Sequence, residues 1–251
     1  MTNLTKLPNQ KLDVKLIALD LDDTLLTKDL TISTKTLNAL TECAKRGIYI
    51  VLCSGRAESG ILPYNKLLNL YNTEQGKYII AINGSSIYDV QKKENIFTKK
   101  IPGETLVSIY KEALKRGFSC QVYNYDTTFA NVDNEFTRID AKLCNLKIEI
   151  VKDFEEFLLE GHTKMLIPGK ENEVAEFTEF LKKKMAGKAE VFTSKPFFLE
   201  VMPYAWGKGQ AILHLAKMLG LEKSQTMAFG DSMNDESMLT CVESSPTRCA
   251  A

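Results

Sequence analysis

The chain has 251 residues, of which 44% are hydrophobic and 25% are charged, the usual composition of a soluble globular protein. Lysine plus arginine equals aspartate plus glutamate at 32 each, so no long-range field is expected to hold nucleic acid or an anionic membrane. No apolar run approaches the roughly 20 residues that cross a bilayer, and the polar N-terminal segment lacks the apolar stretch of a secretory signal.

The first third of the chain alternates predicted strands and helices. Residues 14–19 form a short apolar run, which is typical of a strand buried on both faces. A helix capped by Ser33 or Thr34 is expected to end near Gly47. Further elements are predicted in chain order: a strand at 48–53, a helix at 58–70 and a strand at 78–83. This repetition favours a parallel, doubly wound α/β sheet.

The middle of the chain has shorter strands that carry more polar residues, which suggests a sheet covered on one face only. The elements expected here are strands at 119–124, 127–132, 147–151, 163–167 and 189–193 and helices at 104–116 and 171–185. We interpret residues 85–195 as an α+β cap domain inserted into a core domain of residues 1–84 and 196–251. The core pattern returns with a helix at 207–219, a strand at 226–229 and a helix from 234.

An acidic cluster, Asp20-Leu-Asp22-Asp23, directly follows the first predicted strand. Ligands of open α/β sheets bind outside the carboxyl ends of strands, so the cluster falls where a site is expected. Three carboxylates in four residues repel one another unless a cation lies among them. Taken alone, the segment is equally compatible with a polar turn and an acidic helix cap.

Three further motifs occur at strand ends or helix starts. Ser54-Gly55-Arg56 follows the second strand, where a hydroxyl and backbone N–H groups can hold a phosphate oxygen. Lys208 opens a helix after Trp206-Gly207, and Gly230-Asp231-Ser-Met-Asn234-Asp235 follows the strand at 226–229 with the oxygen ligands that a hard cation needs. Taken alone, the serine motif is more often an ordinary strand-to-helix turn, and the lysine motif is more often a solvated helix start. The last motif alone is as often an Asx-rich helix cap as a cation site.

Together the four motifs have the order and contexts of the haloacid dehalogenase (HAD) phosphatase signature, and the chain most resembles the Cof-type branch. The segment 83–87, Asn-Gly-Ser-Ser-Ile, is similar to the NGxxI segment of that branch, and 200–203, Glu-Val-Met-Pro, to its E-[IV]-x-P approach to the lysine. The resemblance implies a Rossmann-like core with an inserted cap and the hydrolysis of sugar phosphates or related small phosphate esters.

The resemblance also implies a role for each residue of the site. Asp20 is expected to be the nucleophile that forms an aspartyl-phosphate, and Asp22 the acid and then the base. Mg²⁺ is expected on the Asp20 side chain, the Asp22 backbone carbonyl and the Asp231 side chain, with Asp235 orienting these ligands or Lys208. The residues expected to bind the phosphate or the rest of the substrate are Ser54, Gly55, Lys208, Asn234 and Asn83.

The implied protein is a Mg²⁺-dependent phosphoric monoester hydrolase of small phosphorylated metabolites, with the cap closing over the site to exclude water. The six scattered cysteines, without a CxxC, indicate reduced thiols and a cytoplasmic location. No nucleic-acid or membrane partner is expected, and the chain is expected to be a monomer or a small homo-oligomer. Two alternatives stay open: a catalytically weak phosphosugar-binding or regulatory protein, and a related phosphomutase.

The C-terminus departs from the family pattern. After the Asp231–Asp235 motif, Cof-type proteins continue with a fifth core strand and a final helix, whereas residues 243–251 contain Pro246 and small polar residues that do not resemble a strand. The strand at 226–229 is therefore expected to form an exposed edge of the core sheet.

Overall fold

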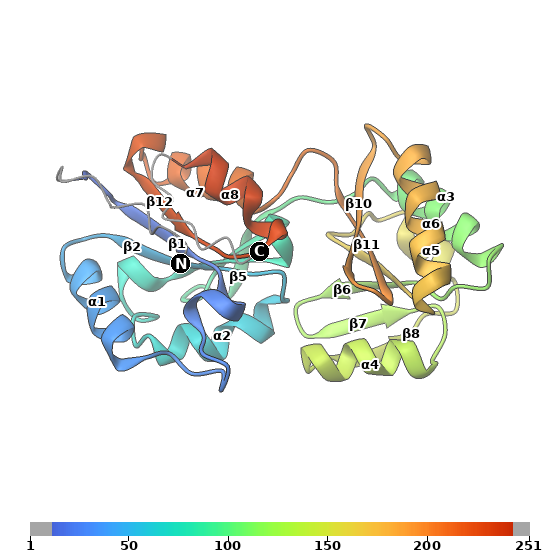
Figure 1. Ribbon diagram of the computed structural model, residues 1–251, viewed down its shortest axis with the longest axis horizontal. Coiled ribbons are helices and arrows are strands. Elements are labelled where there is room, and N and C mark those ends of the chain that lie inside the picture. Colours follow the sequence, from blue (N-terminus) through green and yellow to red (C-terminus); the bar gives the residue numbers. More distant parts are fainter. Residues whose placement is uncertain (1–11, 243–251) are drawn as a thin grey trace, which may run out of the picture. The chain divides into compact units, whose positions relative to one another are not determined.

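The computed structural model describes residues 12–242. The chain divides into two compact units, the first built from residues up to Phe97 and from Gly207 onward, the second from Thr98–Trp206 (Figure 1). Each unit contains a six-stranded mixed sheet with helices, which confirms the predicted α/β fold. No helix within the described part of the chain combines the length and the apolar character needed to cross a membrane.

The first sheet has the strand order β12-β1-β2-β3-β4-β5. Its strands are β12 (Thr226–Phe229), β1 (Leu16–Leu19), β2 (Tyr49–Cys53), β3 (Tyr78–Ala81), β4 (Ser86–Asp89) and β5 (Glu94–Thr98). The strands from β12 to β3 run parallel, as predicted, and β4 pairs antiparallel with β3. Among the described residues β12 is the edge strand, also as predicted, whereas the expected lack of a further strand concerns residues 243–251, which lie outside the described part.

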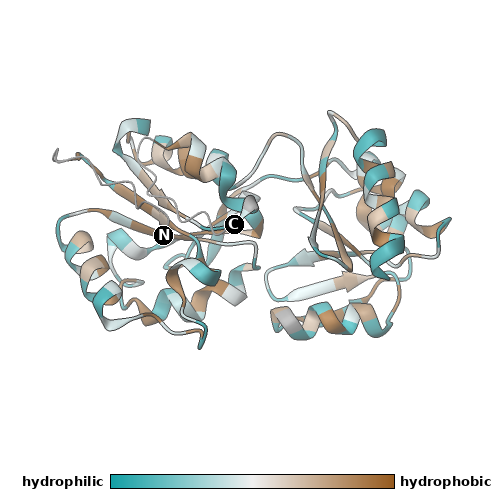
Figure 2. Ribbon diagram, viewed as in Figure 1, coloured by the Kyte–Doolittle hydropathy of each residue, from teal (hydrophilic) through white to brown (hydrophobic). Residues whose placement is uncertain are grey.

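Helices cover both faces of this sheet, which makes it doubly wound. Figure 1 shows α1 (Thr34–Lys45) and α2 (Glu58–Leu67) on one face and α7 (Lys208–Met218) and α8 (Glu236–Cys241) on the other. Ser33 caps α1, because its hydroxyl accepts the N–H of Thr36 at 3.1 Å. Buried apolar residues of β1 and β2 pack against α7, and Figure 2 draws these strands in the brown of hydrophobic residues.

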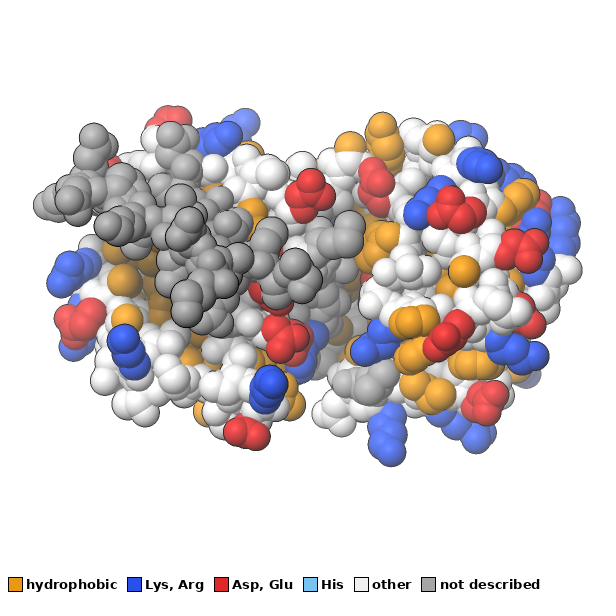
Figure 3. Space-filling model, in the orientation of Figure 1, with side chains coloured by type: hydrophobic (Ala, Val, Ile, Leu, Met, Phe, Trp, Pro, Cys, Tyr) orange, Lys and Arg blue, Asp and Glu red, His pale blue; other side chains and the backbone are white. Residues whose placement is uncertain are grey.

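The second sheet has the order β10-β11-β9-β6-β7-β8. Its strands are β6 (Gln121–Asn124), β7 (Thr127–Ala130), β8 (Lys147–Ile150), β9 (Met165–Pro168), β10 (Ala189–Lys195) and β11 (Phe198–Pro203). One face packs on α3 (Gly103–Leu114), α5 (Phe154–Leu158) and α6 (Glu171–Lys184) through a core that includes Leu106, Phe154 and Phe177. Figure 3 shows acidic and basic side chains interspersed over the visible face of this unit.

The expectation that this sheet is covered on one face only was wrong. The helix α4 (Glu135–Cys144) contacts the other face, where the buried Asp140 carboxylate accepts hydrogen bonds from Gln121 at 2.6 Å and from the Tyr123 hydroxyl at 2.7 Å. The polar Gln121 of β6 therefore belongs to a buried polar network between sheet and helix and not to a solvated face.

The second unit also begins and ends later than the predicted 85–195. The strands β4 and β5 extend the first sheet because β4 pairs with β3, so the chain remains in the first unit until Phe97. At the other end, β11 pairs with both β10 and β9, so the chain stays in the second unit until Trp206. The strands β4, β5 and β11 and the helices α4 and α5 were not predicted from the sequence.

Candidate active site

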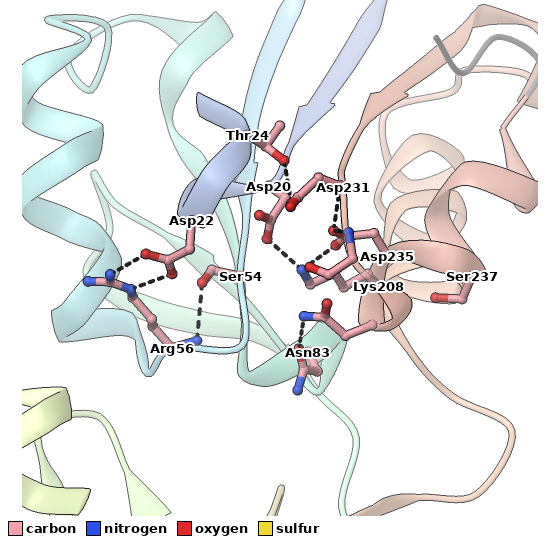
Figure 4. A network of polar contacts seen from close by, with 12 residues as sticks. Asp20, Asp22, Thr24, Ser54, Arg56, Asn83, Lys208, Asp231, Asp235 and Ser237 are labelled. Atoms are coloured by element: carbon pink, nitrogen blue, oxygen red, sulfur yellow. Dashed lines mark hydrogen bonds and ion pairs between the residues drawn. The ribbon is translucent and has the colours of Figure 1, made fainter. Parts of the chain in front are cut away.

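The side chains of the site follow the carboxyl ends of three parallel strands. Asp20 comes directly after β1, Ser54 directly after β2, and Asp231 two residues after β12. Because β12, β1 and β2 are parallel neighbours, these ends lie at one edge of the first sheet (Figure 4). The predicted motifs therefore converge in space.

A buried lysine lies between two buried carboxylates. The Lys208 ammonium donates to Asp20 Oδ1 and to Asp235 Oδ1, each at 2.6 Å. Lys208 and Asp235 are fully buried and Asp20 is 5% exposed, so the two bonds are made almost without water. Burial raises the pKa of Asp20 to about 6, and the charge of Lys208 lowers it while that of Asp235 raises it. Burial alone lowers the pKa of Lys208, but the charges of Asp20 and other neighbours, Asp235 among them, leave it raised overall.

The turn after β12 holds Asp231 and Asp235. Asp235 Oδ2 accepts the backbone N–H groups of Asp231 at 3.1 Å and Ser232 at 3.2 Å, so both oxygens of Asp235 are engaged. Asp231 Oδ1 accepts the Thr24 hydroxyl at 2.9 Å, which ties this turn to the segment after β1. Thr24 was not among the predicted site residues, although it directly follows the acidic cluster of residues 20–23.

Three carboxylates lie close enough to share a cation: Asp20, Asp231 and Asp235 each offer an oxygen within 4.8 Å of the others. Hard divalent cations prefer such oxygen ligands, so the donor set fits Mg²⁺. Since both oxygens of Asp235 are hydrogen-bonded, whereas Asp20 and Asp231 each accept a side-chain bond through Oδ1, the last two are better placed to offer Oδ2 to an ion.

The Asp22 side chain points to Arg56, away from the carboxylates (Figure 4). Arg56 donates from Nη2 to Asp22 Oδ1 at 2.5 Å and from Nε to Asp22 Oδ2 at 3.0 Å. The backbone N–H of Arg56 donates to the buried Ser54 hydroxyl at 3.2 Å, which shapes the loop that carries Gly55. Arg56 belongs to the serine motif but was not predicted as a site residue. Its two hydrogen bonds to Asp22, a forked contact, join two motifs that lie 34 positions apart in the sequence.

The turn between β3 and β4 supports the other loops of the site. Ile82 and Asn83 both have φ of 50°, a left-handed conformation that is uncommon for asparagine and an outlier for isoleucine. Their N–H groups donate to the carbonyls of Arg56 at 2.9 Å and Ser54 at 3.0 Å, so the strained turn holds both sides of the serine loop.

The same turn also approaches the start of α7 and the turn after β12. A Cβ on Gly84, which has φ of 96°, would lie 2.8 Å from the backbone nitrogen of Lys208. A side chain therefore cannot fit there without moving the start of α7. Asn83 Oδ1 accepts a long hydrogen bond, 3.4 Å, from the Asn234 side chain, so these two predicted residues contact each other.

Known proteins resemble this chain over nearly its whole length. Residues 17–246 match the haloacid dehalogenase-like hydrolase family. A Streptococcus pyogenes serotype M6 protein named "Putative phosphatase M6_Spy0533" is 30% identical over 92% of this chain and 86% of its own. The HMP-PP phosphatase of Yersinia pseudotuberculosis is 28% identical over 91% of this chain and 81% of its own.

Solved structures share the fold. A haloacid dehalogenase-like hydrolase from Bacteroides thetaiotaomicron has a TM-score of 0.79 at 29% identity, covering 91% of this chain and 86% of that one. The HAD subclass IIB sugar phosphatase BT4131 has a TM-score of 0.72 at 21% identity, covering 93% of this chain and 94% of that one.

Proposed function

Since the chain belongs to the haloacid dehalogenase-like hydrolase family, we propose that it is a Mg²⁺-dependent phosphatase of small phosphate monoesters from the Cof-type branch of that family. The motifs predicted this family, and the comparisons confirm it. The names of the relatives support phosphatase activity, and we propose sugar phosphates and similar small metabolites as the substrates.

The observation that carries the proposal is the buried Asp20 carboxylate held by Lys208 at 2.6 Å, with an Asp231 oxygen within 4.8 Å. A carboxylate can attack an anionic phosphate only where positive charge offsets their repulsion, and Lys208 provides a full charge that water does not screen. Hydrogen bonding fixes this geometry before any substrate arrives.

We assign the steps to the residues of the chain as follows. A carboxylate oxygen of Asp20 bonds to phosphorus while the bond from phosphorus to the ester oxygen breaks, and Asp22 gives its proton to that oxygen. The alcohol leaves, and the Asp22 carboxylate then takes a proton from water as the water oxygen attacks the aspartyl-phosphate. Inorganic phosphate leaves and Asp20 regains its carboxylate. Ser54, the Gly55 backbone, Lys208, Asn234 and Asn83 are proposed to hold the phosphate or the adjoining part of the substrate.

We assign Mg²⁺ to the Asp20 and Asp231 side chains and the Asp22 backbone carbonyl, with Asp235 supporting Asp231 and Lys208. The two backbone bonds and the lysine bond of Asp235 favour this supporting role. Bound there, the ion offsets the negative charge of nucleophile and phosphate.

The affinity for Mg²⁺ is expected to depend on pH through Asp20. The metal needs the carboxylate, but in the metal-free protein the pKa of Asp20 is raised to about 6. Below pH 6 the proton and the metal compete, so the dissociation constant is expected to rise up to about tenfold per pH unit. Above pH 7 Asp20 is ionised, so it causes no further change in the dissociation constant for Mg²⁺. Calorimetric titration of the metal-free protein with Mg²⁺ from pH 5 to 8 measures this; an affinity independent of pH over that range would contradict the assignment.

A screen of phosphorylated metabolites tests the function itself. Purified protein is assayed for release of inorganic phosphate from p-nitrophenyl phosphate, from a panel of sugar phosphates and from HMP-PP, each with Mg²⁺ and with EDTA. We expect release with Mg²⁺, none in EDTA, and recovery when Mg²⁺ is restored.

The same assay separates the alternatives. A binding or regulatory protein would take up Mg²⁺ and ester without releasing phosphate. A phosphomutase would leave the phosphate on the sugar and require a bisphosphate activator. Full activity in EDTA would mean that the acidic cluster serves another purpose.

A further inference from the structure

We propose that Arg56 positions Asp22 for proton transfer, so that it acts on ester cleavage through Asp22 and not by touching the phosphate. The inference rests on the proposed function, because Asp22 is taken as the acid that protonates the leaving oxygen. Its basis is the forked contact between the two side chains, at 2.5 and 3.0 Å.

The fork fixes a side chain that is otherwise free to rotate. The Asp22 side chain is 49% exposed, so the surrounding protein alone does not select one orientation. Two parallel N–H···O bonds define the plane of the carboxyl group as well as its position, which a single contact cannot do. Each Asp22 oxygen uses one lone pair on Arg56 and retains another, which can face the leaving oxygen or the attacking water.

Arg56 is itself held from several sides. Its guanidinium lies 5.3 Å from the ring centroid of Tyr64 on α2, and its Nη1 donates to the Tyr64 hydroxyl at 3.4 Å. Its backbone N–H donates to Ser54 and its carbonyl accepts the N–H of Ile82. The helix α2 and the serine loop thus set the place of the guanidinium, and the guanidinium sets the place of Asp22.

The geometry also separates Arg56 from the cation that serves the nucleophile. Lys208 contacts Asp20 and Asp235, whereas the Arg56 side chain donates hydrogen bonds to Asp22 and Tyr64. Figure 4 shows the two cations on different sides of the site, Lys208 beside Asp20 and Arg56 beyond Asp22. One cation serves the attacking group and the other serves the proton donor.

Leaving groups that differ in their need for a proton test this division. A p-nitrophenolate departs without protonation, whereas the alkoxide of an alkyl phosphate such as glycerol phosphate does not. Because kcat/KM covers the steps up to departure of the alcohol, it reports on protonation of the leaving oxygen and not on the later hydrolysis of the aspartyl-phosphate. We expect Arg56→Ala to lower kcat/KM for the alkyl ester by at least about tenfold and for the aryl ester by less than about threefold. Arg56→Lys keeps the charge without the fork and is expected to show the same selectivity, more weakly.

Two comparisons make the test specific to Asp22. In an Asp22→Asn background, adding Arg56→Ala is expected to lower kcat/KM for the alkyl ester by less than about a further twofold. The amide at position 22 cannot transfer a proton, so Arg56 has no proton donor left to position. The control Arg138→Ala removes an equally forked pair, to Asp133 at 2.8 and 2.9 Å in the second unit, and is expected to change neither ester.

Other results would overturn the inference. Equal losses on both esters with a raised KM would mean that Arg56 binds the phosphate directly. Losses from Arg56→Ala and Asp22→Asn that multiply would mean that the two act independently. Either result leaves the phosphatase proposal standing if the wild-type chain is active, whereas a wild-type chain that releases no phosphate overturns both.

Discussion

Asp20→Asn is expected to lower phosphate release by more than about a thousandfold while the protein remains folded. The amide has the shape of the carboxylate, but it cannot form the bond to phosphorus on which the proposed two-step reaction depends. Lys208 keeps its bond to Asp235, so the substitution leaves no isolated buried charge. The change in unfolding free energy is therefore expected to stay within about 1 kcal/mol.

The measurement combines steady-state assays with an acid-quenched sample analysed by mass spectrometry. The wild-type chain mixed with substrate is expected to carry one phosphoryl group on the peptide that contains Asp20, and the variant none. Asp133→Asn, an exposed acidic residue of the second unit, is the matched control and is expected to keep full activity. Substantial turnover by Asp20→Asn would refute the nucleophile assignment.

The parts of the site that could be predicted from sequence are those that depend on strand ends. Asp20, Ser54 and Asp231 each follow a short apolar run, and parallel pairing of such strands brings their ends to one edge. The local sequence thus predicts both the strand and the position of the site residue at the end of that strand. The edge position of the strand before Asp231 was predicted from a different observation, the departure of residues 243–251 from the Cof-type family pattern.

The missed contacts depend on where a side chain or a backbone approaches a distant segment. Two such contacts are the hydrogen bonds between the Asp22 and Arg56 side chains and the hydrogen bond from Thr24 to Asp231. Both depend on loop conformations, which hydrophobic patterns and secondary-structure propensities do not predict. The domain boundary was missed for a similar reason. The polar run of β5, and the short β4 before it, resemble the inserted segment in composition. Only the pairing of β4 with β3, and of β5 with β4, assigns them to the first sheet.

The largest expected effect on stability is that of Lys208→Met. Lys208 is fully buried and bonds two carboxylates at 2.6 Å, so its removal leaves Asp20 and Asp235 facing each other without a cation. Removing one partner of a buried ion pair typically costs about 3–5 kcal/mol, because the remaining charge has neither water nor counterion. Urea denaturation in EDTA at pH 7.5 is expected to show a loss of this size, together with loss of turnover.

The cause of that loss is open to test in two ways. Adding Asp235→Asn to Lys208→Met removes one of the two carboxylates left without a cation and is expected to restore part of the stability.

Lowering the pH is also expected to restore stability to Lys208→Met. The pKa of Asp20 is already raised to about 6 in the folded protein, and without Lys208 it rises further, so the folded state takes up a proton more readily than the unfolded chain. Stability of the variant is therefore lost as the pH rises through that pKa and regained as the pH falls below it. If the deficit of Lys208→Met were the same at pH 5 and pH 8, uncompensated carboxylates would not be its source, and lost packing of the lysine stem would explain it instead.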